Sequence, residues 1–439
     1  MWSFETDPEF QEKLDWMAAF IREEIEPLDY LFPKDETYNV NNAALMAILA
    51  PLKNQVREAG LWACHLPPSL GGGGWGQLKL ALMNELLGRS FFAPTVFGTA
   101  APDTGNAEIL AHFGNQAQKD EFLRPLLDGE IVSCFSMTEP QGGADPKVFT
   151  CKATRSNDEW RLSGEKWFAS NARWAEFLIV MVVTDPDVTI YRGASMFLIP
   201  TRTEGVEFVR NSGMAFEEPA HGAHAYLRFN DVRLTDNDLL GNAGDAFKIA
   251  QTRLGGGRVH HAMRTVGLAK RAFEAICERV QSRTTQGDVL ARKQLVQAEV
   301  ADLWMEIEQF RLLVLQTAWK IDKYNDYKVV RQDIAAAKVL SERVMVSAAS
   351  RAIHLHGALG ISNEMPFGEW LLWGYALGLA DGPSEVHQIT VAKEALGASS
   401  STEDLFPSGH IPSGAQAMQK KYAKELQLPG HRRGWVTQA

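Results

Sequence analysis

Residues 378–388 read GLADGPSEVHQ and place a carboxylate at the end of an apolar segment. Asp381 closes the run LLWGYALGLA and directly precedes a Gly-Pro turn. An acid that follows so many apolar residues is either a poorly solvated charge without a role or a charge that takes part in chemistry. The residue types alone leave both interpretations open.

A second candidate is the segment CFSMTEPQGGADP, residues 134–146. Its Ser136 and Thr138 hydroxyls can form hydrogen bonds, and its Gly-Gly pair lets backbone N–H groups approach a flat or phosphorylated ligand closely. An ordinary loop of a β-domain has the same composition. The segment therefore predicts either a ligand-binding loop or a plain connection.

The segment GEKWFASNARWAEF, residues 164–177, sets aromatic side chains beside polar ones. Trp167 and Phe168 could form a wall for a heteroaromatic ring, with Ser170 and Asn171 as hydrogen-bonding groups next to it. A buried aromatic in a β-turn explains this segment equally well when it is considered alone.

The segment LGGGRVHHAMRTVGLAKRAFE, residues 254–274, puts three glycines before Arg258. We expect these glycines at the start of a long helix, where backbone N–H groups and the guanidinium could meet an anion or the thioester end of a substrate. A plain helix with a structural arginine is the alternative.

The histidines and cysteines do not predict a metal site. His354 and His356 are two residues apart and do not share a helix face, and His260 and His261 are adjacent and diverge. The four cysteines have no C-x-x-C spacing, which argues against both a zinc ribbon and a disulfide framework. We expect no metal and a reducing compartment.

The composition excludes several classes of protein. The chain has 439 residues, 45% hydrophobic content and a formal net charge of -10. Such a chain can bury a sizeable core, and its negative charge disfavours nucleic acid and anionic membrane surfaces as partners. The first residues are acidic rather than cationic, and no apolar stretch is long enough to span a bilayer. We expect a cytoplasmic protein without a membrane span.

Periodicity divides the chain into four parts. Residues 1–130 have the apolar spacing of helices, and residues 131–240 form short β-rich runs between turn signals. Residues 241–397 return to helical spacing, whereas residues 398–439 are rich in Ser, Gly and Pro and form an extension. We predict an α+β protein, mainly α: an N-terminal helical domain, a middle β-domain and a C-terminal four-helix bundle. The long helices predicted in the bundle cover 245–282, 292–324 and 328–356.

The order of these parts and their motifs resembles the acyl-CoA dehydrogenase family over residues 5–397. The run TEPQGG at 138–143 matches the family's TEP-x-x-G loop, and ADGPSEVH at 380–387 matches the turn that carries its general base. APDTGNAEIL, residues 101–110, resembles the branch of the family that has aspartate in the base position.

This resemblance implies that FAD binds between the β-domain and the bundle. The loop 135–144 would line the isoalloxazine ring, with Phe168 and Ser170 beside it. Arg283 and residues 354–358 would hold the pyrophosphate and adenine half from a neighbouring subunit, so a homodimer or homotetramer is expected. The cofactor-binding residues implied in this way are Phe135, Ser136, Met137, Thr138, Gly143, Ala144, Phe168, Ser170, Arg283, Gln294, His354, Gly357, Ala358, Pro383 and Glu385.

The resemblance also assigns the general base to Asp381, where most members have glutamate. A second variant of the family carries its base just before the arginine of the long helix. Gly257 stands at that position here and cannot remove a proton, which strengthens the assignment to Asp381. The substrate-binding residues implied are Ala144, Arg258, Asp381 and Gly382.

The function implied is FAD-dependent dehydrogenation of an acyl-CoA to a trans-2-enoyl-CoA in fatty acid β-oxidation, with an electron-transfer flavoprotein as electron acceptor. Asp381 would remove the α-proton while the β-hydride leaves to flavin N5. Two alternatives stay open: a nitroalkane oxidase-like flavoenzyme, and a non-catalytic relative that binds a protein or nucleic acid. The last would use the basic residues Lys420, Lys421, Lys424, Arg432 and Arg433, but the net acidity of the chain disfavours it.

Overall fold

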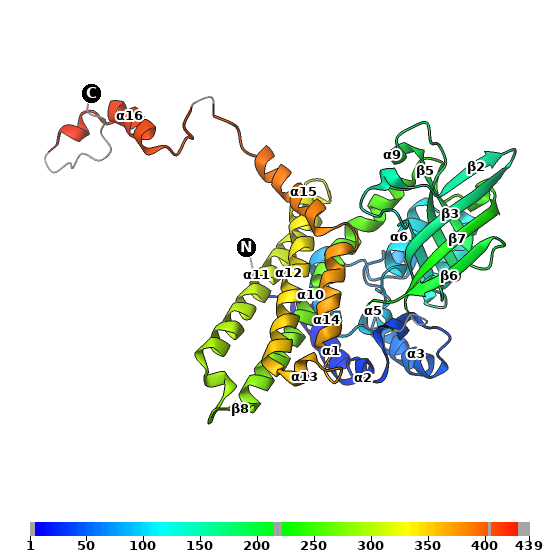
Figure 1. The fold of residues 1–439 in the computed structure, drawn as a ribbon, viewed down its shortest axis with the longest axis horizontal. Helices are drawn as coiled ribbons and strands as arrows, with labels where there is room; N and C mark the ends of the chain where they lie inside the picture. The colour runs from blue at the N-terminus through cyan, green and yellow to red at the C-terminus, as the bar shows by residue number, and fades with distance from the viewer. Residues whose placement is uncertain (1–4, 215–216, 218–221, 403–404, 429–439) are drawn as a thin grey trace. The chain divides into compact units, whose positions relative to one another are not determined.

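A computed structural model describes residues 5–214, 217, 222–402 and 405–428. The chain divides into two units, Met1–Gln388 and Ile389–Ala439. Along the first unit, a helical region, a β-sheet and a second helical region follow one another (Figure 1). Arg432 and Arg433 lie outside the described residues.

The N-terminal region is a group of helices with a shared apolar core. Helix α1 begins after Asp7, whose carboxylate accepts a hydrogen bond from the backbone N–H of Phe10 at 2.9 Å, as is usual at a helix start. Apolar residues recur at helical spacing, so Phe10, Leu14 and Met17 are buried together. The elements are α1 (Pro8–Phe20), η1 (Ile21–Ile25), α2 (Leu28–Leu31), η2 (Lys34–Tyr38), α3 (Ala43–Glu58), η3 (Pro68–Leu70), α4 (Gln77–Leu87), α5 (Ala93–Val96), α6 (Asp103–Phe113), α7 (Gln116–Gln118), η4 (Lys119–Leu123) and α8 (Arg124–Asp128).

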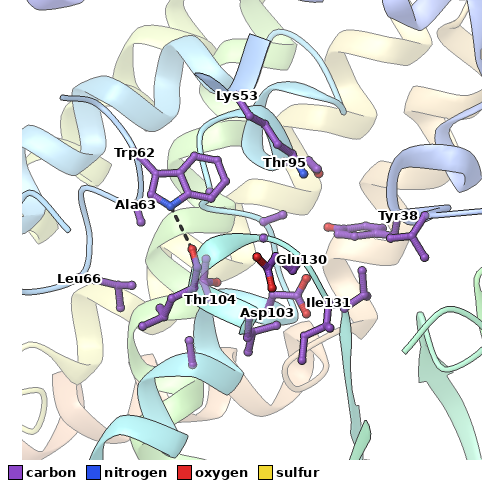
Figure 2. Close-up of a pocket in the computed structure, with 18 of the residues that line it drawn as sticks. Tyr38, Lys53, Trp62, Ala63, Leu66, Thr95, Asp103, Thr104, Glu130 and Ile131 are labelled. Carbon is purple, nitrogen blue, oxygen red and sulfur yellow. Dashed lines mark hydrogen bonds between the residues drawn. The ribbon is translucent and has the colours of Figure 1, made fainter. Parts of the chain in front are cut away.

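These helices border a cavity of about 240 Å³. Figure 2 shows the side chains of Lys53, Asp103 and Glu130 around it. The indole of Trp62 closes one side, where its N–H donates to the carbonyl of Leu127 at 3.1 Å. The cavity is therefore polar on part of its surface.

The middle region forms one sheet, in which seven strands are described. Their order is β1-β4-β2-β3-β7-β6, with β5 paired to β4. β4 and β5 are buried along almost their whole length, which explains why they are continuous apolar runs in the sequence. The elements are β1 (Ser133–Ser136), η5 (Pro146–Val148), β2 (Lys152–Ser156), β3 (Glu159–Ser170), β4 (Phe177–Val183), α9 (Ile190–Gly193), β5 (Ala194–Pro200), β6 (Val206–Ser212), β7 (His224–Leu234) and η6 (Asp236–Asp238).

An irregularity in β3 turns one aromatic side chain outward. The pairing of β3 with β7 shifts between Lys166 and Ala169, and Phe168 there has a φ of +50°. A bulge of this kind bends a strand and redirects a side chain. Phe168 is consequently 43% exposed, whereas Ala169 is fully buried.

The C-terminal region is a bundle in which α10, α11, α12 and α14 run alongside one another (Figure 1). Their facing sides share an apolar core that includes Ala262, Leu303, Val344 and Leu377. The three long helices predicted from the sequence agree with the structure to within about three residues. The elements are α10 (Ala246–Ser282), β8 (Thr284–Thr285), β9 (Asp288–Val289), η7 (Leu290–Arg292), α11 (Gln294–Tyr324), α12 (Arg331–His356), α13 (Ala358–Ile361), α14 (Phe367–Leu379) and α15 (Ser384–Gly397).

One expectation about α10 was wrong. Residues 255–257 precede Arg258 in the interior of this helix rather than at its start. Backbone N–H groups in a helix interior donate to the preceding turn. They are therefore not available to an anionic ligand, and only the Arg258 guanidinium is.

The second unit contains α16 (Ile411–Lys421) and η8 (Glu425–Gln427). Neither element contains a buried residue. Apolar side chains of α16, such as Ile411 and Met418, are therefore exposed.

Two glycines let α10 cross the end of α4 at very short distance. An added Cβ at Gly267 would lie 1.9 Å from the backbone oxygen of Glu85, and one at Gly88 would lie 2.0 Å from that of Arg264. No side chain fits at either position, so the two backbones rest against each other. This crossing fixes α10 against the N-terminal helices.

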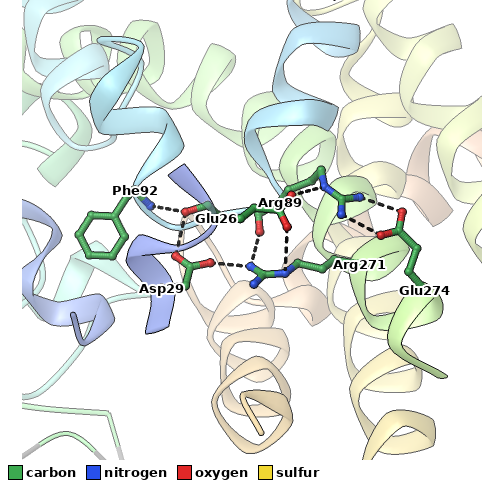
Figure 3. A network of polar contacts seen from close by, with 7 residues as sticks. Glu26, Asp29, Arg89, Phe92, Arg271 and Glu274 are labelled. Carbon is green, nitrogen blue, oxygen red and sulfur yellow. Dashed lines mark hydrogen bonds and ion pairs between the residues drawn. The ribbon is translucent and has the colours of Figure 1, made fainter. Parts of the chain in front are cut away.

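A network of charges closes the same interface (Figure 3). Arg89 donates through Nε to Glu26 at 2.5 Å and through its terminal nitrogens to Glu274 at 2.8 and 2.7 Å. Arg271 donates to Asp29, whose pKa is raised by burial. Because all of these ions except the half-exposed Glu274 are largely shielded from water, removal of one partner would leave the others uncompensated.

We predict that Gly267→Ala destabilises the protein by about 1–3 kcal/mol or more, because the new methyl group has no space against the backbone of Glu85. The measurement is the unfolding temperature. Gly397→Ala is the matched control, since a Cβ there would meet no atom within 4 Å. Equal unfolding temperatures for the two variants would contradict the prediction.

Candidate functional site

Asp381 lies in the turn between α14 and α15. Helix α14 ends at Leu379, and Asp381 and Gly382 follow with φ values of +54° and +102°. Aspartate tolerates this left-handed region better than most residues, and glycine enters it freely. An added Cβ at Gly382 would also lie only 3.0 Å from Nε2 of His387. The turn therefore presents Asp381 at the end of α14 in a conformation that few residues adopt.

The backbone of this turn is held by side chains of three helices. The carbonyl oxygen of Asp381 accepts a hydrogen bond from Nε of Arg258 at 3.1 Å. It lies 3.2 Å from Nε2 of His387, which donates in the tautomer that carries its proton there. Lys338 of α12 is almost fully buried and donates through Nζ to the carbonyl of Leu377. Within the described part of the chain, the N–H of Asp381 donates to no protein group.

The carboxylate of Asp381 faces charged groups, although apolar residues precede it in the sequence. Its Oδ2 lies 3.9 Å from Nε2 of His261, and the Asp381 side chain is 20% exposed. Burial lowers the pKa of His261 to about 4, so this imidazole is neutral at pH 7. Arg258 and Lys338 are close enough for their charges to act on Asp381. The candidate base thus lies in a partly shielded, positive environment.

A buried ion pair fixes the loop that follows β1. Lys166 and Glu139 are almost completely buried, and Nζ of Lys166 lies 2.8 Å from Oε1 of Glu139. The same ammonium donates to the carbonyl of Met137 at 2.9 Å. Glu139 also accepts hydrogen bonds from the backbone N–H groups of Thr150 and Cys151, at 2.6 and 3.1 Å. These bonds hold the loop in one shape.

The outward-facing Phe168 of β3 lies beside the loop that follows β1. The rings of Phe168 and His224 are 5.0 Å apart at an interplanar angle of 31°. The hydroxyl of Ser170 lies 2.9 Å from Nδ1 of His224, and burial lowers the pKa of this histidine to about 4. The backbone N–H of Trp167 donates to the carbonyl of Thr138 at 2.9 Å. The loop and the aromatic wall are therefore one connected structure.

Two buried polar atoms in these segments have no partner among the described residues. They are the hydroxyl of Ser136 and the side-chain amide nitrogen of Asn171. Buried groups of this kind normally find a partner in a ligand or in water. Phe168 adds an aromatic ring that is 43% exposed. An exposed ring and unpaired hydrogen-bonding groups suit a polar heteroaromatic ligand, so these residues fit the isoalloxazine of FAD.

The other predicted cofactor residues near the loop and the turn are mostly accessible. Gly143 and Ala144 are exposed in the loop after β1. Pro383 follows Gly382 in the turn, and Glu385 is exposed in the first turn of α15.

The residues predicted to hold the adenine half are exposed at the far end of the bundle. Arg283 follows α10, Gln294 opens α11, and His354 belongs to the last turn of α12, with Gly357 and Ala358 directly after it. The first residue of α14, Phe367, contacts His356 near that end, with ring centroids 4.6 Å apart. Asp381 follows the other end of α14, whose 13 residues span about 20 Å. The described chain does not bring these residues to Asp381.

The sequence did not reveal one charged group that acts on the base, Arg253, or the polar residues that hold it. Arg253 of α10 donates through Nε to Asn106 at 2.9 Å, and Asn106 donates to the hydroxyl of Ser133 at 2.8 Å. Asp103 accepts from the N–H and hydroxyl of Ser133 at 2.8 and 2.6 Å. The Arg253 charge in turn acts on Asp381. The motif APDTGN, which contains Asp103 and Asn106, was the one signal in the sequence.

Comparison with known proteins agrees with this geometry. The family model of the acyl-CoA dehydrogenase N-terminal domain matches residues 7–130, that of the middle domain residues 134–232, and that of the C-terminal domain residues 244–396. The chain belongs to the acyl-CoA dehydrogenase family. It therefore has the fold of a family of FAD-dependent oxidoreductases.

Individual relatives agree with this assignment. The probable acyl-CoA dehydrogenase FadE2 of Mycobacterium tuberculosis is 38% identical over 81% of this chain and 87% of its own length. Acyl-CoA dehydrogenase family member 11 of Gallus gallus is 37% identical over 79% of this chain, which spans 45% of that longer protein. A putative acyl-CoA dehydrogenase from Mycobacterium abscessus has a TM-score of 0.83 at 36% identity, covering 90% of this chain and 100% of that one.

Three structural findings apply to the described residues of this family member. They include no group of three or more His, Cys, Asp or Glu side chains that could hold a metal ion. None of the helices they form has both the length and the apolar character needed to cross a membrane. The four cysteines, Cys64, Cys134, Cys151 and Cys277, are free thiols.

We predict that Lys166→Met destabilises this dehydrogenase by about 3–5 kcal/mol, because Glu139 is left charged and unpaired in the interior. FAD content should fall as well, since the Met137 carbonyl loses its donor. The measurements are the unfolding temperature and the ratio of flavin to protein absorbance. The double variant Lys166→Met with Glu139→Gln should recover part of the stability, and a double variant less stable than Lys166→Met would contradict this.

A second prediction concerns pH. Burial raises the pKa of Asp103 from 3.8 to about 6, so the folded state holds this proton more tightly than the unfolded state. The contribution of Asp103 to stability must therefore fall as pH rises from about 4 to about 6, by about 3 kcal/mol in total. Asp103→Asn cannot lose a proton, and it should gain stability relative to the wild type over that range. Unfolding temperatures of both proteins between pH 4 and 7 test this, and a constant difference would contradict it.

Proposed function

We propose that the protein is an acyl-CoA dehydrogenase that converts an acyl-CoA thioester to the trans-2-enoyl-CoA, with Asp381 as general base. The observation that carries this proposal is the geometry of the base turn. Its carbonyl is engaged by Arg258 and His387. Among the described residues, its N–H has no acceptor and its carboxylate has no ion pair with a residue charged at pH 7. One residue thus offers a base and a hydrogen-bond donor to the same substrate.

The chemistry requires both groups at once. The α-proton of a thioester is weakly acidic, so the carboxylate of Asp381 must be held against it to accept the proton. The N–H of Asp381 donates to the thioester carbonyl oxygen, where negative charge develops as the α-proton leaves. His261 is neutral at pH 7 and does not neutralise the base. FAD, when bound, accepts the hydride that leaves the β-carbon.

The residues proposed to hold the flavin ring come from the loop and the aromatic wall. Phe168 would lie against the ring, while the hydroxyls of Ser136 and Ser170 would reach its polar edge. The backbone of Met137 and Thr138 is fixed by Lys166 and Trp167 and can contribute further hydrogen bonds.

We also propose that the working protein is a homodimer or homotetramer. Exposed apolar side chains on α11 support this: Leu295 is 85%, Trp304 54% and Leu312 47% exposed. Arg283 and His354, at the end of the bundle remote from Asp381, would then serve the FAD of a second subunit. An electron-transfer flavoprotein is the proposed electron acceptor.

A nitroalkane oxidase-like activity is the second candidate. It is favoured by one observation, which is that the base is an aspartate rather than the glutamate of most acyl-CoA dehydrogenases. The two activities differ in what the reduced enzyme does, because an oxidase returns its electrons rapidly to oxygen.

The test is the visible spectrum of the FAD-loaded protein under anaerobic conditions, before and after addition of acyl-CoA thioesters or nitroalkanes. We expect the flavin to bleach with acyl-CoA. Asp381→Asn should retain FAD and slow bleaching by at least about 10²- to 10⁴-fold, since the base is lost. Asp120→Asn, at a half-exposed site, is the control and should behave as wild type. Bleaching only by nitroalkanes would favour the oxidase, and a near-normal rate for Asp381→Asn would show that another residue is the base.

A further inference from the structure

Arg253 is a charged side chain that the reaction described above does not use. It lies on α10, and burial lowers the pKa of its guanidinium. The side chain fits only because residue 105 is a glycine, where an added Cβ would lie 2.8 Å from Cγ of Arg253. The fold thus makes room for a guanidinium that is only partly shielded from water.

The hydrogen bonds of Arg253 are incomplete. Nε donates to the neutral side chain of Asn106 at 2.9 Å, and the guanidinium lies 4.1 Å from the centre of the Phe135 ring. Among the described residues, its two terminal nitrogens have no acceptor and no carboxylate lies within ion-pair distance. Neither terminal nitrogen is among the fully shielded polar atoms that lack a partner, so both remain accessible to a ligand.

Other arginines of α10 show that the fold can satisfy such groups. Arg264 donates to the side chain of Asn84 and to the carbonyl of Thr99 at 2.8 and 2.5 Å. Arg271 has a carboxylate and a carbonyl as acceptors. The unpaired terminal nitrogens of Arg253 are therefore not a general property of this helix.

The neighbours of Arg253 indicate where a ligand that accepts hydrogen bonds from its guanidinium would lie. Phe135 belongs to the loop that is proposed to line the flavin, and Asp381 is the carboxylate whose charge acts most strongly on Arg253. The reacting part of an acyl group must lie between the flavin loop and the base. An acceptor on the acyl chain just beyond its reacting carbons would come within reach of the guanidinium.

We propose that Arg253 is a specificity-determining residue that selects acyl groups carrying an oxyanion, such as a carboxylate, beyond the reacting carbons. The inference rests on the proposed acyl-CoA dehydrogenase function. A guanidinium binds two oxygens of an oxyanion in parallel, whereas a hydrocarbon chain leaves its charge and its terminal N–H groups without a partner.

Three carboxyl groups also act on the charge of Arg253, and none of them replaces the ligand. Asp103 already accepts two hydrogen bonds from Ser133. Glu108 has its pKa raised to about 7 by burial, and it forms no ion pair with Arg253 at hydrogen-bonding distance among the described residues. Asp381 must stay free to accept the substrate proton.

The test compares acyl-CoA thioesters of equal carbon number that end in a methyl group, a hydroxyl or a carboxylate, over a range of lengths. Rates of anaerobic bleaching are measured for the FAD-loaded wild type, Arg253→Met and Arg253→Lys. Dissociation constants are measured from the flavin spectrum in an Asp381→Asn background, where the ligand binds without reducing the flavin. Arg124→Met, the same change at an exposed arginine, is the control.

We expect the wild type to prefer a carboxylate to a methyl end by about 10- to 100-fold, the range of a hydrogen bond to a charged group. Arg253→Met should abolish this preference, Arg253→Lys should keep part of it, and Arg124→Met should keep all of it. The hydroxyl compound should fall between the other two, because it can accept a hydrogen bond but brings no charge.

Two results would overturn the inference. Equal weakening of all three ligands by Arg253→Met would mean that Arg253 contacts the CoA part or the loop, and an unchanged ratio would mean that it contacts no ligand. If Arg253→Met does not fold with FAD, Gly105→Ala displaces the guanidinium without removing it and should lower the same ratio. Failure of every thioester to bleach the wild type would refute the proposed function itself, which is a different outcome from bleaching without discrimination.

Discussion

The carbonyl of Asp381 is the point on which the rest of the site depends. It accepts hydrogen bonds from Arg258 of α10 and, in one tautomer, from His387 of α15, while Lys338 of α12 holds the carbonyl of Leu377 one turn earlier. A backbone in the left-handed region costs free energy unless its surroundings hold it there. These donors therefore fix the direction of the carboxylate. They engage the carbonyl of Asp381, whereas its N–H has no acceptor in the part of the chain that the structure describes.

Helix α10 links the position of the base turn to the sheet and to the N-terminal helices. Its first turns share a core with α6 and the sheet, through Ile249, Ala250 and Leu110, and its middle rests on α4 at Gly267. The charges of Arg271 and Glu274 then tie it to the N-terminal helices. A shift of α10 would move Arg258 and Arg253 together, so packing remote from the site also positions the base relative to the flavin loop.

The sequence predicted the three regions, the long helices and the turn at Asp381, because these depend on local periodicity and on Gly and Pro. It did not predict features that depend on distant partners. Phe168 points outward only because β3 shifts against β7, and Lys166 and Glu139 resemble ordinary surface charges until the fold buries them together. Arg253 likewise resembled a helix-surface arginine, since its burial depends on α6 and on a glycine at position 105. The triple glycine was misjudged because its place within α10 depends on where the helix begins.

The use of aspartate as base follows from the same turn. Aspartate is shorter than glutamate by one methylene, and an error of about 1 Å in the position of a catalytic group can cost about 10²-fold in rate. A shorter side chain also has fewer torsions, so its carboxylate is placed mainly by the backbone. A turn whose carbonyl is held by Arg258 and His387 supplies that precision. The position of the Asp381 carboxylate therefore depends on the hydrogen bonds to the carbonyl of the same residue. Weakening these bonds would affect proton removal even though neither donor touches the carboxylate.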